Sequence, residues 1–193
     1  MSKNEIIASI RKNKPSLIEL ELPDYQQFRE DIDTVSLFKR QVNEAGGRVI
    51  ECNRGDIEKI LSDNYQNASE VYSLIDEFKP LDNRSADDEP SEYKNLDLVV
   101  LNGKFGVAEN GAIWVPDSNL SQRIIPFITR NLVLVVIQES LVANMHDAYA
   151  EIGNFSEGFG VFIAGPSKTA DIEQSLVIGA QGALSLMVLL VSD

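Results

Sequence analysis

The sequence predicts an α/β fold in which a mainly parallel sheet is covered by helices. Short apolar runs bounded by glycine, proline or polar residues are typical of strands, and Leu132–Ile137 is the clearest of them. Amphipathic segments with apolar residues at three- and four-residue steps lie between these runs, as in Phe28, Ile32 and Val35. Strands that are apolar on both faces are characteristic of parallel sheets, in which both faces are buried.

The first half of the chain reads as helix, linker, helix, Gly-Gly, strand, helix and strand. A short helix ends before Pro15, and a linker follows it, so that residues 1–24 form an N-terminal helix and linker. The remaining elements expected in this half are a helix at Tyr25–Ala45, a strand at Arg48–Cys52, a helix at Ile57–Tyr65 capped by Asp56, and a strand at Glu70–Ile75.

The second half follows a polar, mostly acidic segment at residues 81–93, which we expect to be a surface loop. The elements expected after it are strands at Leu96–Leu101, Ala112–Val115, Leu132–Ile137, Val161–Ala164 and Leu184–Val191, with a helix at Ser140–Ile152. No repeat or internal boundary interrupts this pattern, so we expect a single domain over residues 1–193.

Composition narrows the classes of partner. The chain has 17 basic and 30 acidic residues, a net charge of −13 and a pI near 4.5. A binder of nucleic-acid backbones needs a basic face, and so does a protein that docks on an anionic membrane surface. We therefore expect neither nucleic acid nor membrane as a partner, whereas a small anionic ligand stays compatible with this charge.

Cysteine and histidine counts exclude several kinds of site. The chain has one cysteine, Cys52, and one histidine, His146. This rules out an internal disulfide, a thiolate-held iron–sulfur cluster and a Cys/His zinc site, and we expect no metal site. The N-terminus lacks the apolar core of a signal peptide, so we expect a cytoplasmic protein. Exposed strand edges would allow a homodimer.

The segment Val161–Ala183 predicts a strand, a tight turn and a helix that begins near Lys168. Such a turn directs free backbone N–H groups at a ligand, with Lys168 and the hydroxyls of Ser167 and Thr169 beside them. Phosphate or carboxylate is the expected occupant, and Asp171 would orient Lys168 or hydrogen-bond a ligand hydroxyl. The spacing of Gly160 and Gly165 differs from a P-loop.

Glu109 is the sharpest candidate for chemistry because it lies in a glycine-flanked turn between two apolar strands. Gly106 and Gly111 would allow close approach of the backbone to a ligand. Arg123 offers a bidentate partner for Glu109 or for a ligand carboxylate. The alternatives are a turn acid that caps a helix and an arginine on a surface loop.

Two segments resemble the lactate-utilization protein C family, also called the LUD domain family. They are AGPSKTADIE with the following IGAQGA, and FGVAENGAIWV at Phe105–Val115. The resemblance covers Leu96 to the C-terminus and implies a fold of the NagB/RpiA/CoA-transferase-like type. The AENG string is also similar to the S-E-N-G segment of class I CoA-transferases, in which the glutamate is the nucleophile.

The resemblance implies a component of L-lactate utilisation that works with iron–sulfur partner proteins, the clusters being held by those partners. It would bind a small organic acid or a phosphorylated ligand at the carboxyl ends of the strands. We expect one site, with Glu109 as the catalytic candidate and Gly106, Asn110, Gly111, Arg123, Gly165, Ser167, Lys168, Thr169 and Asp171 as ligand-binding candidates. A stand-alone acyl or CoA transferase and a non-catalytic regulatory module are the alternatives.

Overall fold

The chain divides into two compact units, Met1–Glu30 and Asp31–Asp193. The structure, a computed structural model, describes residues 2–15, 32–79, 93, 95–153, 158–170, 176–179 and 182–192. The first unit contains the expected N-terminal helix, α1 (Lys3–Lys12), which begins with a capping box between Ser2 and Glu5. The second unit contains all the strands described below. One domain over residues 1–193 therefore stays a prediction.

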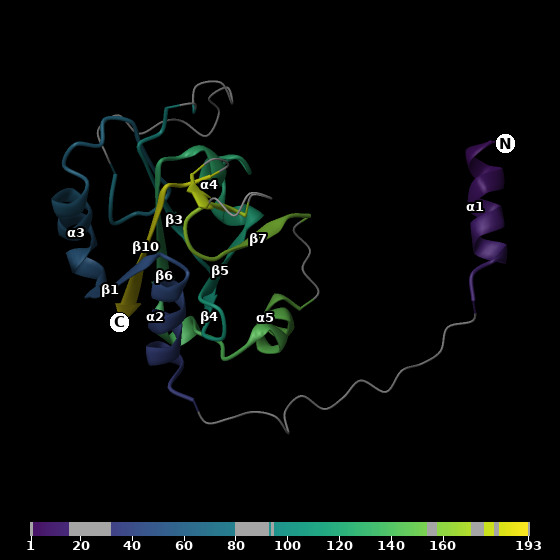
Figure 1. The fold of residues 1–193 in the computed structure, drawn as a ribbon, viewed down its shortest axis with the longest axis horizontal. Helices are drawn as coiled ribbons and strands as arrows, with labels where there is room; N and C mark the ends of the chain where they lie inside the picture. The colour runs from purple at the N-terminus through teal and green to yellow at the C-terminus, as the bar shows by residue number, and fades with distance from the viewer. Residues whose placement is uncertain are drawn as a thin grey trace. The chain divides into compact units, whose positions relative to one another are not determined.

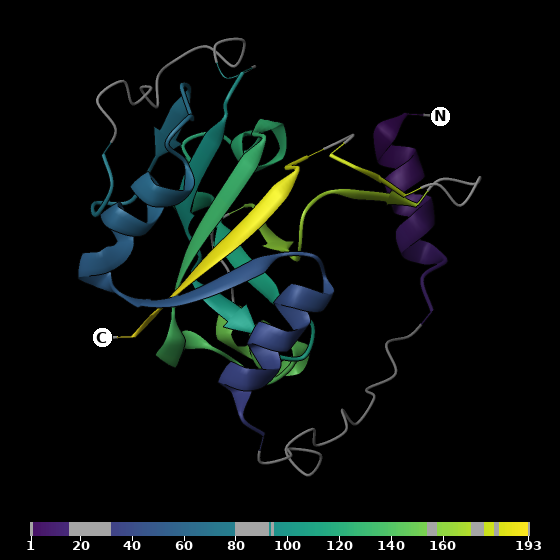
Figure 2. The ribbon, with the colours of Figure 1, turned by 60° about the vertical axis from the view of Figure 1, so that its left-hand side comes forward.

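The centre of the second unit is a five-stranded sheet in which every neighbouring pair is parallel. Its strand order is β1-β10-β6-β3-β2. The strands are β1 (Arg48–Asn53), β2 (Val71–Ser73), β3 (Leu98–Asn102), β6 (Asn131–Ile137) and β10 (Ser185–Ser192). Figure 2 shows the green β6 and the yellow β10 running side by side in one direction. The predicted parallel α/β fold is thus confirmed, with β6 at the centre of the sheet.

The other strands form two small antiparallel sheets. One has the order β4-β5-β7, and the other pairs β8 with β9. These strands are β4 (Phe105–Val107), β5 (Ala112–Pro116), β7 (Gly160–Ile163), β8 (Lys168–Ala170) and β9 (Leu176–Ile178). The strand expected at Val161–Ala164 therefore exists, but it pairs with β5 and not with the parallel sheet.

Helices and the second sheet cover the parallel sheet in layers. Among the described residues of the second unit, the helices are α2 (Thr34–Glu44), α3 (Ile57–Asn64), α4 (Ile125–Ile128) and α5 (Met145–Ile152), with short 3-10 helices η2 (Arg54–Asp56), η4 (Asp117–Asn119) and η5 (Gln138–Ser140). Figure 1 shows α3 on one side of the parallel sheet, the β4-β5-β7 sheet on the other, and α5 beyond that second sheet.

Alternate side chains of β10 enter two different cores. Leu190 faces the core shared with α2 and β5, and Leu189 faces the core shared with α3; both side chains are fully buried. A third cluster, which includes Trp114 and Ala148, joins the β4-β5-β7 sheet to α5. This explains why the central strands β3, β6 and β10 lack a polar face, since they are buried on both sides, whereas the edge strand β1 keeps exposed residues such as Arg48 and Glu51.

Helix α2 is shorter than the sequence predicted. Asp33 precedes it and caps it, because the Asp33 carboxylate accepts hydrogen bonds from the backbone N–H and the hydroxyl of Ser36. The predicted continuous helix over Tyr25–Ala45 is wrong, because Ile32 and Asp33 are not helical. Residues 25–31 lie outside the described residues.

The predicted helix from Lys168 is also wrong, since Lys168–Ala170 pairs with Leu176–Ile178 as an antiparallel hairpin. The backbone N–H of Ser167 donates to the Ala183 carbonyl oxygen, and its own carbonyl accepts from Gly179 N–H. These bonds hold Ser167 in extended pairing, so it is not the N-cap of a helix. Tertiary pairing overrides the weak helical spacing of this short segment.

Two smaller expectations in the second half are corrected. Helix α5 begins at Met145 and not near Ser140, because Asn144 caps it by accepting from Asp147 N–H. The acidic segment 81–93 lies outside the described residues except for Tyr93. That side chain is fully buried and packs edge-on against Tyr72, so the last residue of the segment belongs to the core.

Candidate functional site

Glu109 lies in the turn between β4 and β5, and its side chain reaches the start of α5. One carboxylate oxygen, Oε2, accepts a hydrogen bond from the backbone N–H of Met145 at 2.9 Å. The backbone N–H of Glu109 donates to the carbonyl oxygen of Ala143 at 3.0 Å. A carboxylate at a helix N-terminus is stabilised by the helix dipole. The described contacts therefore give Glu109 a capping role at α5.

The other candidate residues in and beside this turn also make structural contacts with neighbouring parts of the chain. Asn110 Oδ1 accepts from Ala112 N–H at 2.9 Å and closes the turn. Gly111 has φ +68°, and a Cβ there would lie 2.7 Å from a backbone nitrogen of α2. A Cβ at Gly106 would lie 2.8 Å from the Phe38 ring. The close backbone approach that these glycines allow is therefore to α2 and its core.

The turn before Lys168 is fixed in a similar way. Gly165 has φ +71°, and a Cβ there would lie 2.4 Å from a carbonyl oxygen at the C-terminal end of α2. Lys168 itself is exposed. Its Nζ lies 3.5 Å from the position that a Cβ on Gly46 would take. The side chain of Thr169 and the whole of Asp171 lie outside the described residues.

Arg123 is bound to a neighbouring carboxylate. Its Nε and Nη2 donate to the two carboxylate oxygens of Asp117 at 2.9 and 2.7 Å. The guanidinium also lies over the Phe159 ring, 4.9 Å from its centroid. These hydrogen bonds from Arg123 lower the pKa of the Asp117 carboxyl below its usual value. The arginine therefore braces the segment after β5, and no hydrogen bond or ion pair joins it to Glu109.

The Glu109 turn and the turn before Lys168 lie next to each other, because β5 pairs with β7 so that Ile113 is opposite Ile163, and Gly111 and Gly165 both pack against the last residues of α2. Glu109 is bound to Ala143 and to the start of α5, which follow the carboxyl end of β6. Ser167 is bound to Ala183, just before the amino end of β10, and Lys168 lies by Gly46, just before β1. No described hydrogen bond or ion pair joins Glu109 to Lys168, so the expected single site stays a prediction.

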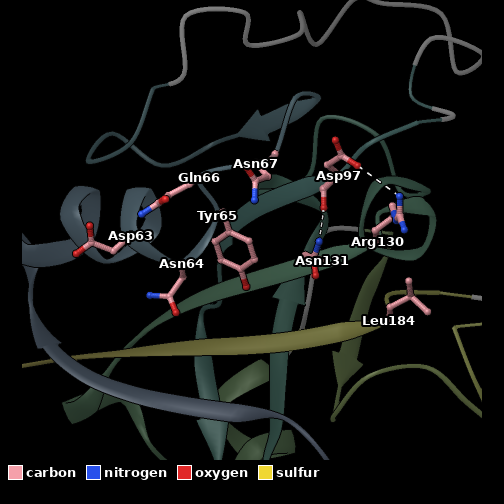
Figure 3. A pocket seen from close by; sticks show the side chains of 10 residues that line it. Asp63, Asn64, Tyr65, Gln66, Asn67, Asp97, Arg130, Asn131 and Leu184 are labelled. Carbon is pink, nitrogen blue, oxygen red and sulfur yellow. Dashed lines mark hydrogen bonds and ion pairs between the residues drawn. The ribbon is translucent and has the colours of Figure 1, made fainter.

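A pocket of about 480 Å³ opens at the amino edge of the parallel sheet. It lies between the end of α3 with the loop that follows it and the residues where β3, β6 and β10 begin (Figure 3). Its lining residues are Asp63, Asn64, Tyr65, Gln66, Asn67, Ala68, Asp97, Arg130, Asn131 and Leu184. Most of these side chains are polar, and three of them are charged.

A hydrogen-bond network fixes the floor of this pocket. Asp97 Oδ2 accepts from the backbone N–H and the hydroxyl of Ser69, at 3.0 and 2.8 Å. The side-chain amide of Asn131 donates to the Asp97 carbonyl at 2.8 Å, and its oxygen accepts from the Ser185 hydroxyl at 2.6 Å. The network thus links the first residues of β6 and β10 to the residue before β3.

Two pKa shifts follow from this environment. The Ser69 hydroxyl and then its backbone N–H lower the pKa of the Asp97 carboxyl, with a smaller contribution from Arg130. Burial raises the pKa of the Tyr65 phenol, and a hydrogen bond with Ser185 partly opposes that rise. Asp97 therefore stays ionised to lower pH than a free aspartate.

The sequence interpretation missed this pocket, although a signal for it exists. Asp97 and Asn131 are polar residues placed just before and at the start of two apolar strands. Since neighbouring parallel strands bring their amino ends together, polar residues at such positions meet at one edge. Residues 65–67 line the pocket because of the way the segment after α3 packs, and no local sequence pattern encodes that packing.

Two searches of the described residues gave negative results. No helix there is both long and apolar enough to cross a membrane. No group of three or more His, Cys, Asp or Glu side chains in the described ranges is placed to hold a metal ion.

Comparisons with known proteins give the chain a family. The sequence model of the LUD domain matches residues 91–191. The chain is 30% identical over 118 residues to "Lactate utilization protein C" of Shouchella clausii, an alignment that covers 58% of this chain and 51% of that protein. It is 33% identical over 109 residues to the protein of the same name from Geobacillus thermodenitrificans, covering 53% and 45%. The chain thus spans about half the length of these curated relatives.

A solved structure supports the fold. The crystal structure of a DUF162 family protein from Deinococcus radiodurans matches with a TM-score of 0.65 and covers 82% of this chain and 96% of that chain. Its sequence identity of 14% shows similarity of fold alone. Since the LUD model matches more than half of the residues, the chain belongs to the LUD-domain family.

Proposed function

We propose that this chain takes part in lactate utilization and binds a small organic acid. The observation that carries the proposal is the LUD match over residues 91–191, together with relatives named "Lactate utilization protein C". The matched region contains the whole central part of the parallel sheet, from β3 through β6 to β10.

Electron transfer in this proposal belongs to iron–sulfur partner proteins. A thiolate-held cluster needs several cysteines, and the 193 residues contain one. Oxidation of lactate to pyruvate releases two electrons, so a chain without its own redox centre would act beside proteins that have one. Its own contribution would be to bind the acid or to support the complex.

Affinity purification of the tagged chain tests this proposal. Cells of the source organism grown on lactate, and cells grown on glucose as the control, are lysed under anaerobic conditions so that clusters survive. We expect iron–sulfur proteins to co-purify from the lactate-grown cells, and deletion of the gene to slow growth on lactate only. Recovery of the chain alone, with normal growth of the deletion strain on lactate, would contradict the proposal.

An acyl or CoA transferase that uses Glu109 is the second candidate. The observation in its favour is the exposed position of Glu109 in the β4–β5 turn. The hydrogen bond from Met145 N–H stands against it, because the carboxylate already has a structural partner. A transferase would form a glutamyl–CoA thioester, which intact-mass measurement after incubation with acyl-CoA detects. An unmodified mass with acetyl-, propionyl- and succinyl-CoA removes this candidate.

A further inference from the structure

We propose that the pocket at the amino edge of the parallel sheet binds a small monocarboxylate that carries a hydroxyl group beside its carboxylate. Nothing in the family match or in the names of the relatives assigns a site to these residues. The proposal deepens the proposed function, since lactate is an acid of this class, and it rests on that function for the choice of ligand.

Several polar groups that line the pocket already have hydrogen-bond partners within the protein. Asp97 is held by Ser69, and Asn131 is bound on both ends of its amide, by donation to the Asp97 carbonyl and acceptance from Ser185. The Tyr65 hydroxyl is hydrogen-bonded with Ser185. Because these groups are fixed by one another, this part of the lining is preorganised, and the conformational entropy lost on binding comes from exposed side chains such as Arg130.

Other lining groups keep free hydrogen-bonding capacity. The Arg130 side chain is 69% exposed, and its Nη1 lies 3.9 Å from Asp97 Oδ1, which is a loose ion pair. Most of its N–H donors are therefore available. The amides of Gln66 and Asn67 are exposed and have no hydrogen bond to another described residue. Figure 3 shows Arg130 and Asp97 at one end of the pocket, with Asn67 and Tyr65 between them and Asp63.

This arrangement selects the class of ligand. A guanidinium pairs in a bidentate manner with a carboxylate. A neighbouring amide both donates to and accepts from a hydroxyl, which suits a hydroxy acid better than an unsubstituted acid. The charged lining residues are Asp63, Asp97 and Arg130, one cation against two anions. That excess of negative charge disfavours phosphate or a dicarboxylate relative to an acid with a single charge.

Calorimetric titration of the purified chain with L-lactate tests the proposal, with propionate, inorganic phosphate and malate as comparison ligands. We expect L-lactate to bind more tightly than any of the three. Arg130→Gln should weaken L-lactate binding about tenfold or more, because a charge-assisted pair is lost. Arg40→Gln is the matched control, since Arg40 is similarly exposed and also makes a loose ion pair, with Glu44 at 3.8 Å.

A second variant separates the hydroxyl from the carboxylate. Asn67→Ala should reduce L-lactate affinity to that of propionate and leave propionate binding unchanged. The Asn67 amide has no hydrogen bond to another described residue, so this variant should keep its fold, which circular dichroism verifies. Three outcomes would each overturn the proposal: lactate binding that survives both substitutions, tighter binding of phosphate or malate, or no detectable binding at an L-lactate concentration 50 times a Kd of about 1 mM.

Failure here is distinguishable from failure of the proposed function. Co-purification with iron–sulfur proteins does not depend on Arg130 or Asn67. If the partners are recovered but lactate does not bind in this pocket, the site is wrong and the function stands. If lactate binds here and is lost in Arg130→Gln while no partner is recovered, the binding site stands and the proposed assembly is wrong.

Discussion

At the scale of single residues, the two segments that resemble the family act through glycines that press against one helix. Gly111 and Gly165 both have positive φ, and both would place a Cβ against the backbone of the last turns of α2. Residues far apart in the sequence thereby hold α2 against the sheet. A short signature of this kind reports a packing requirement as readily as a catalytic one.

Gly165→Ala should lower the free energy of unfolding by about 1–2 kcal/mol or more. The left-handed backbone at φ +71° is strained for an alanine, and a Cβ 2.4 Å from the carbonyl oxygen of Ala45 would force the neighbouring backbone to shift. Gly55→Ala is the control, because nothing lies within 4 Å of its Cβ position. Urea denaturation followed by circular dichroism measures the difference. Equal stability of the two variants would show that the α2 contact carries no such constraint.

At the scale of elements, polar side chains join segments that local propensity leaves independent. Asp97 ties the segment before β2 to the start of β3, through Ser69 and the backbone N–H of Glu70. Asn144 and Glu109 together define where α5 begins. Element boundaries in this protein are thus fixed by caps and by links between strands.

Asp97→Asn should cost about 1 kcal/mol at pH 7, since a charged acceptor is replaced by a neutral one that keeps the same geometry. The pKa of Asp97 is lowered in the folded protein, so its contribution is full above the unfolded pKa and is lost as pH falls through the folded value. The stability gap between wild type and variant should therefore close below about pH 4. Urea titrations at several pH values between 3 and 7 measure the gap. A gap that is constant over this range would contradict the assignment.

At the scale of the whole molecule, the parallel sheet, the β4-β5-β7 sheet and α5 are joined by the side chains packed between them, so we expect these layers to unfold together. Ile113 and Val115 of β5 belong to the core under the parallel sheet, while Trp114 between them faces the cluster against α5. One strand therefore connects the two sheets into a continuous packing unit.

Leu189→Ala and Leu190→Ala test this cooperativity, because the two side chains are fully buried on opposite faces of β10. Each should cost about 2–5 kcal/mol. Leu74→Ala, at a side chain that is 39% exposed, should cost less than either. Circular dichroism and the fluorescence of the single tryptophan, Trp114, should report one coincident transition in every variant. Separate midpoints would show that the layers unfold independently.

The apolar runs alone were enough to predict the parallel sheet, its central strand at Leu132–Ile137 and the α/β class, because burial on both faces leaves a continuous signal in the sequence. The glycine-flanked turns at Glu109 and Gly165 were also visible. The places of those turns were not visible, because they depend on how β5 pairs with β7 and on how both turns pack against α2. Pairing between distant segments decided that Lys168 begins a strand, that Glu109 caps α5, and that Tyr65 and Arg130 share a pocket. Such contacts join residues far apart in the chain, and no local propensity or spacing encodes them.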